Sequence, residues 1–238
     1  MCPLLMKLIF TSERLSVQVH PDDAYAELHH QSLGKTEAWY VIDAEPGAAV
    51  AVGFREPITR ERLQEAARSG EIERLLAWHK VKAGDVVFVP AGTVHAIGAG
   101  LTICEVQENS DITYRLYDYG RPRELHLEHG VAVSKLEPYS LDADAVTIAA
   151  GREALVACQY FRMERLRARS AVQIEGGLPY YLLLLCLAGE GKIGEATFEP
   201  GQAWFAPAGG EEIWIESGGS EWILAYRAAE ASSGVSVR

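Results

Sequence analysis

The stretch GDVVFVPAGTVH at residues 84–95 decides the fold of this chain. Its apolar residues 86–89 lie between a glycine and Pro90, which is the pattern of a short strand bounded by turn residues. The Pro-Ala-Gly turn that follows can present His95 at the start of the next strand, facing the interior. The stretch therefore predicts a β domain with an imidazole directed inward.

Three more side chains of metal-binding type lie upstream, in strand-like sequence. Gln18 and His20 are two residues apart in a strand, so they project from the same face, as two ligands of one ion must. Glu37 stands at the head of a second β-rich run. Any one of these residues alone is more often an ordinary polar residue. The spaced combination of Q-x-H, a later Glu and G-x5-P-x-G-x2-H is far more specific and indicates a metal site.

The four side chains supply one amide oxygen, two imidazoles and one carboxylate. This mixed nitrogen and oxygen set suits Zn²⁺ and can hold other divalent ions. An ion held there with an open coordination position would act as a Lewis acid on a substrate oxygen. The remaining histidines are interpreted as ordinary helix or surface residues and are not assigned to the metal: His29, His30, His79, His126 and His129.

Short strand-like runs separated by Gly and Pro turns dominate the rest of the chain, at residues 15–19, 39–42, 101–106 and 113–117. They predict a β-sandwich or barrel. Two helices interrupt the strands. Residues 21–30 predict a short helix. Residues 59–79 predict a longer helical insertion, which Thr59 caps and Gly70 breaks.

A weak internal repeat indicates a second β unit. Residues 84–92 and 201–209 both consist of a glycine, a polar residue, four mostly apolar residues and Pro-Ala-Gly. Residues 184–193 predict a hairpin before the second copy, and Glu211 and Glu212 follow it where a histidine would match His95. We therefore predict a metal-bearing unit over residues 1–133, which includes the helical insertion, a linker over 134–151, and a degenerate, metal-free unit over 152–229.

Composition narrows the classes of function. The chain has 238 residues, 48% of them hydrophobic and 23% charged, as in an ordinary soluble globular protein. Its net charge of −11 argues against general affinity for nucleic acid or an anionic membrane, because both need a basic surface. The longest apolar run, residues 182–188, is too short to cross a bilayer, and no signal-peptide pattern is present, so we expect a cytoplasmic protein. The scattered cysteines are expected to be free thiols.

Four blocks of the sequence resemble type I mannose-6-phosphate isomerases of the short bacterial branch, which belong to the cupin superfamily. The blocks are LSVQVHPDD at residues 15–23, GKTEAWY at 34–40, VPAGTVHAI at 89–97 and QENSDITYRLYD at 107–118. Residues 84–95 fit the second cupin motif, while Gln18, His20 and Glu37 replace the usual His-x-His and Glu of the first. The resemblance is dense from residue 3 to about residue 121 and looser beyond.

The resemblance implies an all-β tandem cupin, that is, two jelly-roll barrels with a small helical insertion. It implies one Zn²⁺ per chain, held by the residues matching the family's ligands, and interconversion of mannose 6-phosphate and fructose 6-phosphate through an enediol. Arg115 matches the family's catalytic arginine. Lys35, Glu105 and Asp111 match active-site polar residues. We expect a monomer or homodimer that binds a small sugar phosphate in carbohydrate metabolism.

An aldose–ketose isomerisation needs a proton moved between C1 and C2, a stabilised enediolate oxygen and a hold on the phosphate. A metal ion or an arginine can stabilise the oxygen. Either Glu105 or Lys35 can move the proton if its pKa lies near neutrality, and the sequence leaves this choice open. Two rival functions are a metal-containing cupin that binds a sugar or sugar phosphate without turnover, and a cupin oxygenase, which the glutamine ligand disfavours.

Family members begin several dozen residues earlier than this chain, with segments that feed the first β unit. The first residues here match a strand inside the family domain. We expect the absent strands to leave a barrel edge exposed and to weaken substrate binding.

Overall fold

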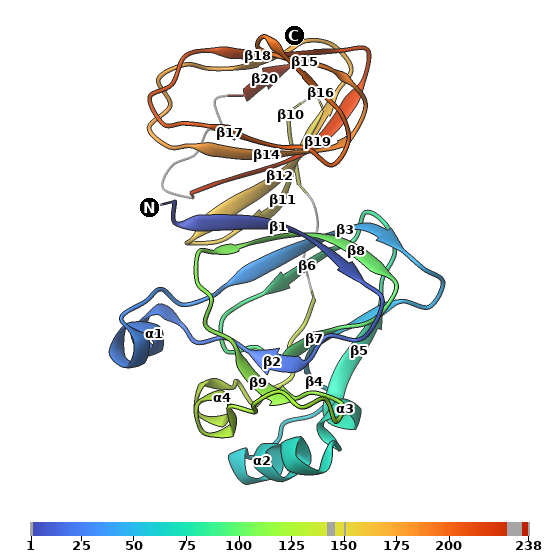
Figure 1. Ribbon diagram of the computed structural model, residues 1–238, viewed down its shortest axis with the longest axis vertical. Coiled ribbons are helices and arrows are strands. Elements are labelled where there is room, and N and C mark those ends of the chain that lie inside the picture. The colour runs from blue at the N-terminus through green and yellow to red at the C-terminus, as the bar shows by residue number, and fades with distance from the viewer. Residues whose placement is uncertain (1, 142–145, 150, 228–234, 238) are drawn as a thin grey trace. The chain divides into compact units, whose positions relative to one another are not determined.

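A computed structural model describes residues 2–141, 146–149, 151–227 and 235–237 (Figure 1). The chain divides into two compact units, Met1–Asp142 and Ala143–Arg238. Two antiparallel sheets make up each unit, so the predicted all-β fold class is confirmed. Among the described residues, no helix has both the length and the apolar character needed to cross a bilayer.

Two sheets enclose the core of the first unit. The four-stranded sheet has the order β1 (Leu4–Thr11), β8 (Leu101–Glu108), β3 (Glu37–Ala44) and β6 (Val86–Val89). The five-stranded sheet has the order β5 (Leu76–Lys80), β4 (Ala49–Phe54), β7 (His95–Ile97), β2 (Val17–Val19) and β9 (Tyr114–Tyr117). Neighbouring strands in both sheets run antiparallel, as in a jelly roll.

The side chains packed between these sheets change from apolar to polar along the strands. At one end it is apolar, with Trp39 and Val41 of β3 packed against residues such as Ile97 of β7 and Ile103 of β8. Successive inward positions on a strand are two residues apart. Two residues before Trp39 stands Glu37, two before Ile97 stands His95, and two after Ile103 stands Glu105. The opposite end of the same interior is therefore polar, and the candidate site lies there.

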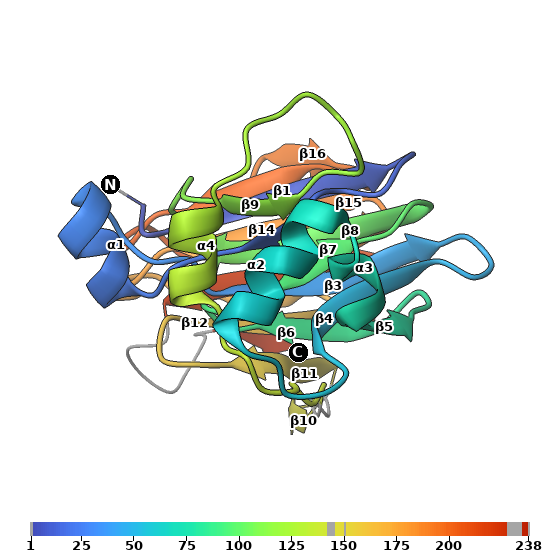
Figure 2. The same cartoon turned by 90° about the horizontal axis from the view of Figure 1, so that it is seen from below.

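Helices cover the outer face of the five-stranded sheet. Figure 2 shows α2 (Arg60–Ser69), α3 (Ile72–Leu75) and α4 (Leu127–Val133) lying over these strands. Leu63 and Ala66 of α2 pack with Val19 and Leu116, which face outward from β2 and β9. This second apolar cluster holds the sheet that carries three of the predicted ligand positions, so the ligands rest on a rigid support.

The helix predicted over residues 59–79 is only partly right. Thr59 caps α2 by accepting a hydrogen bond from Arg62 N at 3.2 Å, and Gly70 ends it with a φ of 82°. A side chain at Gly70 would also collide with the Tyr117 hydroxyl, which lies 2.8 Å from an ideal Cβ position. After the short helix α3, residues 76–80 form strand β5 and pair with β4. Strand pairing there outweighs the helical spacing of the apolar residues, and His79 lies in this strand rather than at a helix end.

The predicted short helix is confirmed as α1 (Asp23–His30). The Asp22 side chain caps it by accepting from Tyr25 N at 2.9 Å. The chain enters α1 directly after His20 and returns where Lys35 N donates to Pro21 O at 2.9 Å. This closed excursion connects His20 with Glu37.

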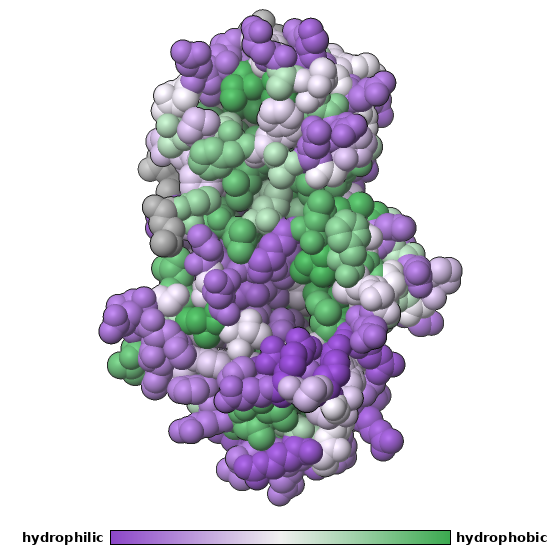
Figure 3. Space-filling model, in the orientation of Figure 1, coloured by the Kyte–Doolittle hydropathy of each residue, from purple (hydrophilic) through white to green (hydrophobic). Residues whose placement is uncertain are grey.

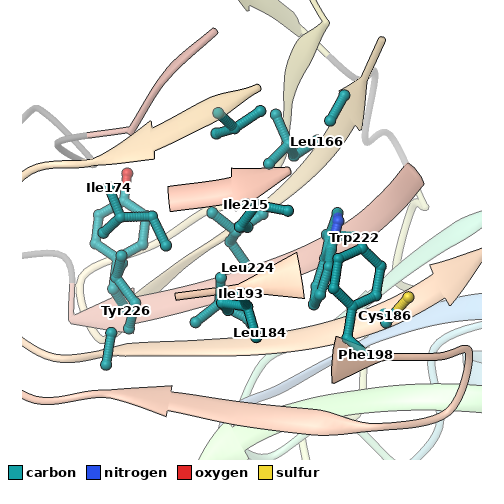
Figure 4. Packing of buried hydrophobic residues seen from close by; sticks show 14 residues of the cluster. Leu166, Ile174, Leu184, Cys186, Ile193, Phe198, Ile215, Trp222, Leu224 and Tyr226 are labelled. Carbon is teal, nitrogen blue, oxygen red and sulfur yellow. The ribbon is translucent and has the colours of Figure 1, made fainter. Parts of the chain in front are cut away.

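The second unit also has two sheets. One has the order β10 (Val146–Ala149), β11 (Arg152–Ala157), β12 (Phe161–Ala168), β19 (Ser220–Arg227), β14 (Leu182–Ala188) and β17 (Ala203–Ala206). The other has the order β16 (Ala196–Phe198), β15 (Gly191–Ile193), β18 (Ile213–Ser217), β13 (Val172–Ile174) and β20 (Val235–Val237). Figure 4 shows its core, in which Trp222 lies edge-on to Phe198 and Leu184 and Leu224 pack nearby.

Both copies of the internal repeat form the edge strand of a sheet. Strand β6 is the edge of its sheet and pairs with β3, and β17 is the edge of its sheet and pairs with β14. The hairpin predicted over residues 184–193 is wrong, because β14 and β15 belong to different sheets. A chain that crosses between sheets at Gly189 looks in sequence like a chain that turns back on itself.

The stretch predicted as a linker is largely structured. Leu136 packs on the outer apolar cluster of the first unit, and Tyr139 and Leu141 pack against its inner one. Residues 146–149 form β10 of the second unit. Residues 142–145 and 150, which the linker prediction also covers, lie outside the described residues.

Candidate active site and metal centre

Strand pairing gathers the predicted ligands at the polar end of the first unit. Gln18 on β2 lies opposite His95 on β7 and, on its other side, opposite Arg115 on β9. Residues directly opposite in antiparallel strands project from the same face. His20 follows one residue beyond β2, and Glu37 approaches from the other sheet at the start of β3.

His20, Glu37 and His95 form a compact buried triad. Their ligand atoms lie within 4.8 Å of one another. His95 Nε2 lies 3.2 Å from Glu37 Oε1, and His20 Nε2 lies 3.5 Å from Glu37 Oε2. Within the described parts of the chain, no other group of three His, Cys, Asp or Glu side chains converges in this way. Two imidazoles and one carboxylate are a usual protein ligand set for a divalent metal.

Hydrogen bonds on the far side of each ring fix the tautomers that metal binding requires. His20 Nδ1 lies 2.8 Å from Ile112 O, and His95 Nδ1 lies 2.9 Å from Thr93 O. A carbonyl oxygen only accepts, so each Nδ1 carries the proton and each Nε2 keeps its lone pair toward the triad. Burial lowers the pKa of both imidazoles and, together with the Lys35 ammonium, outweighs the Glu37 carboxylate, which would raise it. The rings are therefore neutral.

Glu37 is a buried carboxylate whose negative charge a bound cation would neutralise. It is fully buried, and neither carboxylate oxygen accepts a well-directed hydrogen bond from a described residue. Burial alone would raise the pKa of Glu37, but neighbouring positive charge, that of the Lys35 ammonium first, outweighs it and holds that pKa well below its usual range. The Lys35 ammonium, 3.0 Å from Oε2, compensates part of this buried charge, but an ionised carboxylate buried with so few donors is still costly. The residues of this triad therefore fit a divalent metal ion.

Gln18 and Lys35 complete the surroundings of the triad. The Gln18 amide nitrogen lies 3.2 Å from His95 Nε2, and its oxygen accepts from Ser16 Oγ. The amide can be turned over with its other partner still satisfied, because a hydroxyl both donates and accepts, and its oxygen would then face the triad. Lys35 Nζ lies 3.0 Å from Glu37 Oε2 and 3.2 Å from His20 Nε2, so its ammonium supplies positive charge beside the carboxylate.

A second buried carboxylate, Glu105, shares this end of the interior. Trp39 Nε1 donates to its Oε1 at 3.1 Å, and Lys7 Nζ lies 3.2 Å from its Oε2. Burial, assisted by the charge of Glu37, raises the pKa of Glu105 to about 7 against the opposing charges of Lys35 and Lys7. Sequence reasoning missed Lys7. Its signal is a lone charge in the otherwise uncharged strand LLMKLIFT, opposite Glu105 in the pairing of β1 and β8.

The remaining predicted site residues lie at the margin. The Arg115 guanidinium donates to Glu124 O at 2.9 Å, while its buried Nε has no acceptor among the described residues. Asp111 is exposed, yet its charge acts on Lys35. Burial lowers the pKa of Lys35, but Glu37, Glu105 and Asp111 outweigh it, so that pKa lies above its ordinary value. The lysine is thus held as an ammonium, and of the two possible proton carriers only Glu105 has a pKa near neutrality.

The known proteins with similar sequences are named as mannose-6-phosphate isomerases. A mannose-6-phosphate isomerase of Streptococcus mutans is 41% identical over 199 residues, which are 80% of this chain and 62% of that protein. The mannose-6-phosphate isomerase ManA of Bacillus subtilis is 37% identical over 239 residues, which are 94% of this chain and 75% of that protein. No family model matches the chain.

The chain belongs to the mannose-6-phosphate isomerase family. The crystal structure of the mannose 6-phosphate isomerase from Bacillus subtilis superimposes with a TM-score of 0.83 at 31% identity, over 94% of this chain and 74% of that one. The chain spans less than two thirds of the Streptococcus mutans relative. The cupin-type fold of this family is thus the fold found here.

In this member of the mannose-6-phosphate isomerase family, the two units differ in the residues that fill their interiors. The core of the second unit is built from apolar residues, among them Ile174 and Leu182. Glu211 is exposed, and Glu212, also exposed, accepts hydrogen bonds from Gln173 Nε2 and Trp214 Nε1. The second unit does contain a buried carboxylate, Glu164, but it accepts a hydrogen bond from Tyr226 Oη and pairs with Arg152, and no group of three ligand side chains converges among the described residues of this unit.

Proposed function

We propose that this chain is a zinc-dependent isomerase that interconverts mannose 6-phosphate and fructose 6-phosphate through an enediol. One observation carries the proposal: the buried triad of His20, Glu37 and His95 stands beside Glu105, whose pKa is raised to about 7. Membership in the family supports the choice of substrate, since the named relatives are mannose-6-phosphate isomerases.

We assign the metal to Gln18, His20, Glu37 and His95. The two neutral imidazoles, the ionised carboxylate and the amide oxygen are a donor set that zinc accepts. The chemistry that such an ion supplies when bound is Lewis acidity toward the oxygens on C1 and C2. The backbone carbonyls behind the two histidines orient the rings, and Lys35 adds a second positive charge where oxygen becomes negative.

The proton transfer is assigned to Glu105. Its raised pKa matches a group that takes a proton from one carbon and returns it to the neighbouring carbon near neutral pH. Trp39 and Lys7 hold its two oxygens, so the carboxylate keeps one orientation in both halves of the reaction. Asp111, at the exposed margin, keeps Lys35 charged.

Arg115 is assigned to the substrate's negative charge. It projects from the same face as Gln18, and its guanidinium is held at one end by Glu124 O, which leaves other N–H groups for a ligand. A guanidinium meets an enediolate or a phosphate with paired hydrogen bonds.

A coupled isomerase assay tests the proposed function. Protein loaded with one equivalent of Zn²⁺ is expected to convert mannose 6-phosphate, and a chelated sample of the same protein is expected to lose this activity. Binding of mannose 6-phosphate without turnover by fully loaded protein would contradict isomerase activity and identify a binding protein instead. Oxygen uptake with Fe²⁺ in place of isomerisation would point to an oxygenase.

A further inference from the structure

A second group of imidazoles lies outside the proposed active site, where α1 meets α4. His29 and His30 come from the last turn of α1, and His129 comes from α4. Their ring centres are 5.4 Å apart for His29 and His129, 5.8 Å for His30 and His129, and 6.4 Å for His29 and His30. We call these three residues the histidine cluster. The sequence offered no reason to group them, because neighbouring helix residues point apart.

Tyrosine hydroxyls form hydrogen bonds with two of the three rings. Tyr25 Oη lies 2.9 Å from His129 Nδ1, and Tyr114 Oη lies 2.5 Å from His30 Nε2. No described residue hydrogen-bonds the other nitrogen of either ring. His29 has both nitrogens free within the described residues and stacks on Tyr25 at 4.2 Å. Metal-binding histidines commonly have this arrangement, with one nitrogen anchored by an outer partner and the other available.

The spacing of the rings also suits one shared ion. With Zn–N bonds of about 2 Å in tetrahedral geometry, three coordinating imidazoles have ring centres about 5 Å apart. The observed separations of 5.4 to 6.4 Å are somewhat longer than this value, and the rings are tilted by 51° to 72° rather than stacked on one another. The free nitrogens do not yet converge as those of His20 and His95 do. His29 is exposed and has no hydrogen bond within the described residues, so rotation about its side-chain torsions can turn it toward the other two rings.

The charge around the histidine cluster favours a cation. The carboxylate of Glu128, next to His129 in α4, is close enough to act on the Tyr25 hydroxyl. Figure 3 shows many hydrophilic residues on this face of the first unit. His29 and His30 are exposed and His129 is half-buried, so water can reach the rings. The chain as a whole carries a net charge of −11.

We propose that His29, His30 and His129 form a peripheral binding site for a divalent transition-metal ion such as Zn²⁺, with water completing its coordination. Imidazole nitrogen is a good ligand for Zn²⁺, Ni²⁺ and Cu²⁺. The ion would join α1 to α4. Because α1 lies on the excursion between His20 and Glu37, binding would fasten that segment to the helical layer.

Zn²⁺ titration of protein that already carries one equivalent tests the site. By calorimetry, the parent chain is expected to take up close to one further ion per chain. His29→Gln and His30→Gln should each weaken that second binding by about tenfold or more, and a variant combining His29→Gln with His129→Gln should lose it. Glu27→Gln, an exposed change on the same helix, is the matched control and should bind two ions.

His95→Ala separates the two sites, since it should lose the buried ion and keep the peripheral one. Far-UV circular dichroism establishes that each variant is folded. The proposal is overturned if the parent binds only one ion at saturating Zn²⁺. It is equally overturned if the His29→Gln variant, which loses an exposed ring without hydrogen bonds, binds the second ion as tightly as the parent.

Discussion

Glu105 is the side chain on which the proposed chemistry most depends. Because its pKa is raised to about 7, the carboxyl is protonated at lower pH and cannot accept a proton from the substrate. We expect kcat/KM to rise with pH through the region near 7. Glu105→Gln should lower kcat/KM by about 10²-fold or more and remove this dependence. A steady-state pH profile of both proteins checks the prediction, and an unchanged profile in the variant would refute the assignment.

The raised pKa of Glu105 affects stability in the opposite direction, because stability falls as pH rises. The folded-state pKa of Glu105 lies above its ordinary value of 4.5, so the folded chain binds this proton more tightly than the unfolded chain. The stabilising contribution is fully present below the ordinary pKa and is lost as pH rises through about 7. Urea unfolding across this window should show a shallower pH dependence for Glu105→Gln than for the parent.

Arg115 is the residue assigned to the substrate's negative charge. Arg115→Ala should lower kcat/KM by about 10²-fold or more, the scale of losing one preorganised charge donor. A loss mainly in KM indicates phosphate binding, whereas a loss mainly in kcat indicates stabilisation of the transition state. Arg115→Lys is the control, because it keeps the charge and loses the paired hydrogen bonds. If Arg115→Ala isomerises as fast as the parent, Arg115 is not a site residue.

Among the connecting elements, the segment between β9 and α4 positions Arg115. Buried Asp118 accepts hydrogen bonds from Arg121 Nη2 at 2.6 Å and Arg123 Nε at 2.6 Å. The chain then returns beside β9, where His126 N donates to Arg115 O at 2.8 Å and Glu124 O accepts from the Arg115 side chain. Burial would raise the pKa of Asp118, but the two arginines outweigh it and lower that pKa. Asp118 therefore stabilises the fold above the ordinary carboxyl pKa, and this contribution is lost as pH falls through the lowered value.

Removing Asp118 should loosen this segment. We expect Asp118→Ala to lower the free energy of unfolding by about 1 to 3 kcal/mol, because charge-assisted hydrogen bonds are lost. The kcat/KM should also fall, since Glu124 no longer holds Arg115 in place. Urea unfolding and steady-state kinetics measure the two effects. Glu124→Ala is the matched control and should leave both near parental values, because only its backbone carbonyl is used. A parental kcat/KM in Asp118→Ala would show that the segment does not position Arg115.

At the scale of the whole molecule, the proposed metal joins the two sheets of the first unit, because Glu37 comes from one sheet and His95 from the other. Purified protein is expected to hold one tightly bound ion at the triad, and His95→Ala should lose it. Chelation should lower the thermal stability of residues 1–142 and leave the second unit nearly unchanged. Hydrogen exchange read region by region measures this. Equal loss of protection in both units, or full metal retention in His95→Ala, would contradict the ligand assignment.

The sequence alone was enough for features that depend on local chemistry. The β fold follows from many short apolar runs bounded by Gly and Pro, and the cap at Thr59 marks the start of the longer helix. The residue spacing of Gln18 and His20 and the turn before His95 indicated a metal site, because ligand type and strand alternation are written directly in the chain. The repeat at residues 201–209 indicated the second unit for the same reason.

Tertiary structure alone decided what depends on neighbours distant in sequence. Residues 76–80 became a strand because β4 was there to pair with them, and β14 and β15 separated because each found partners in a different sheet. Lys7 reached Glu105 through the pairing of β1 with β8, and burial beside Glu37 then raised the pKa of Glu105 to about 7. Sequence could name Glu105 and Lys35 as possible proton carriers, but only burial and surrounding charge, which are properties of the folded chain, distinguish them.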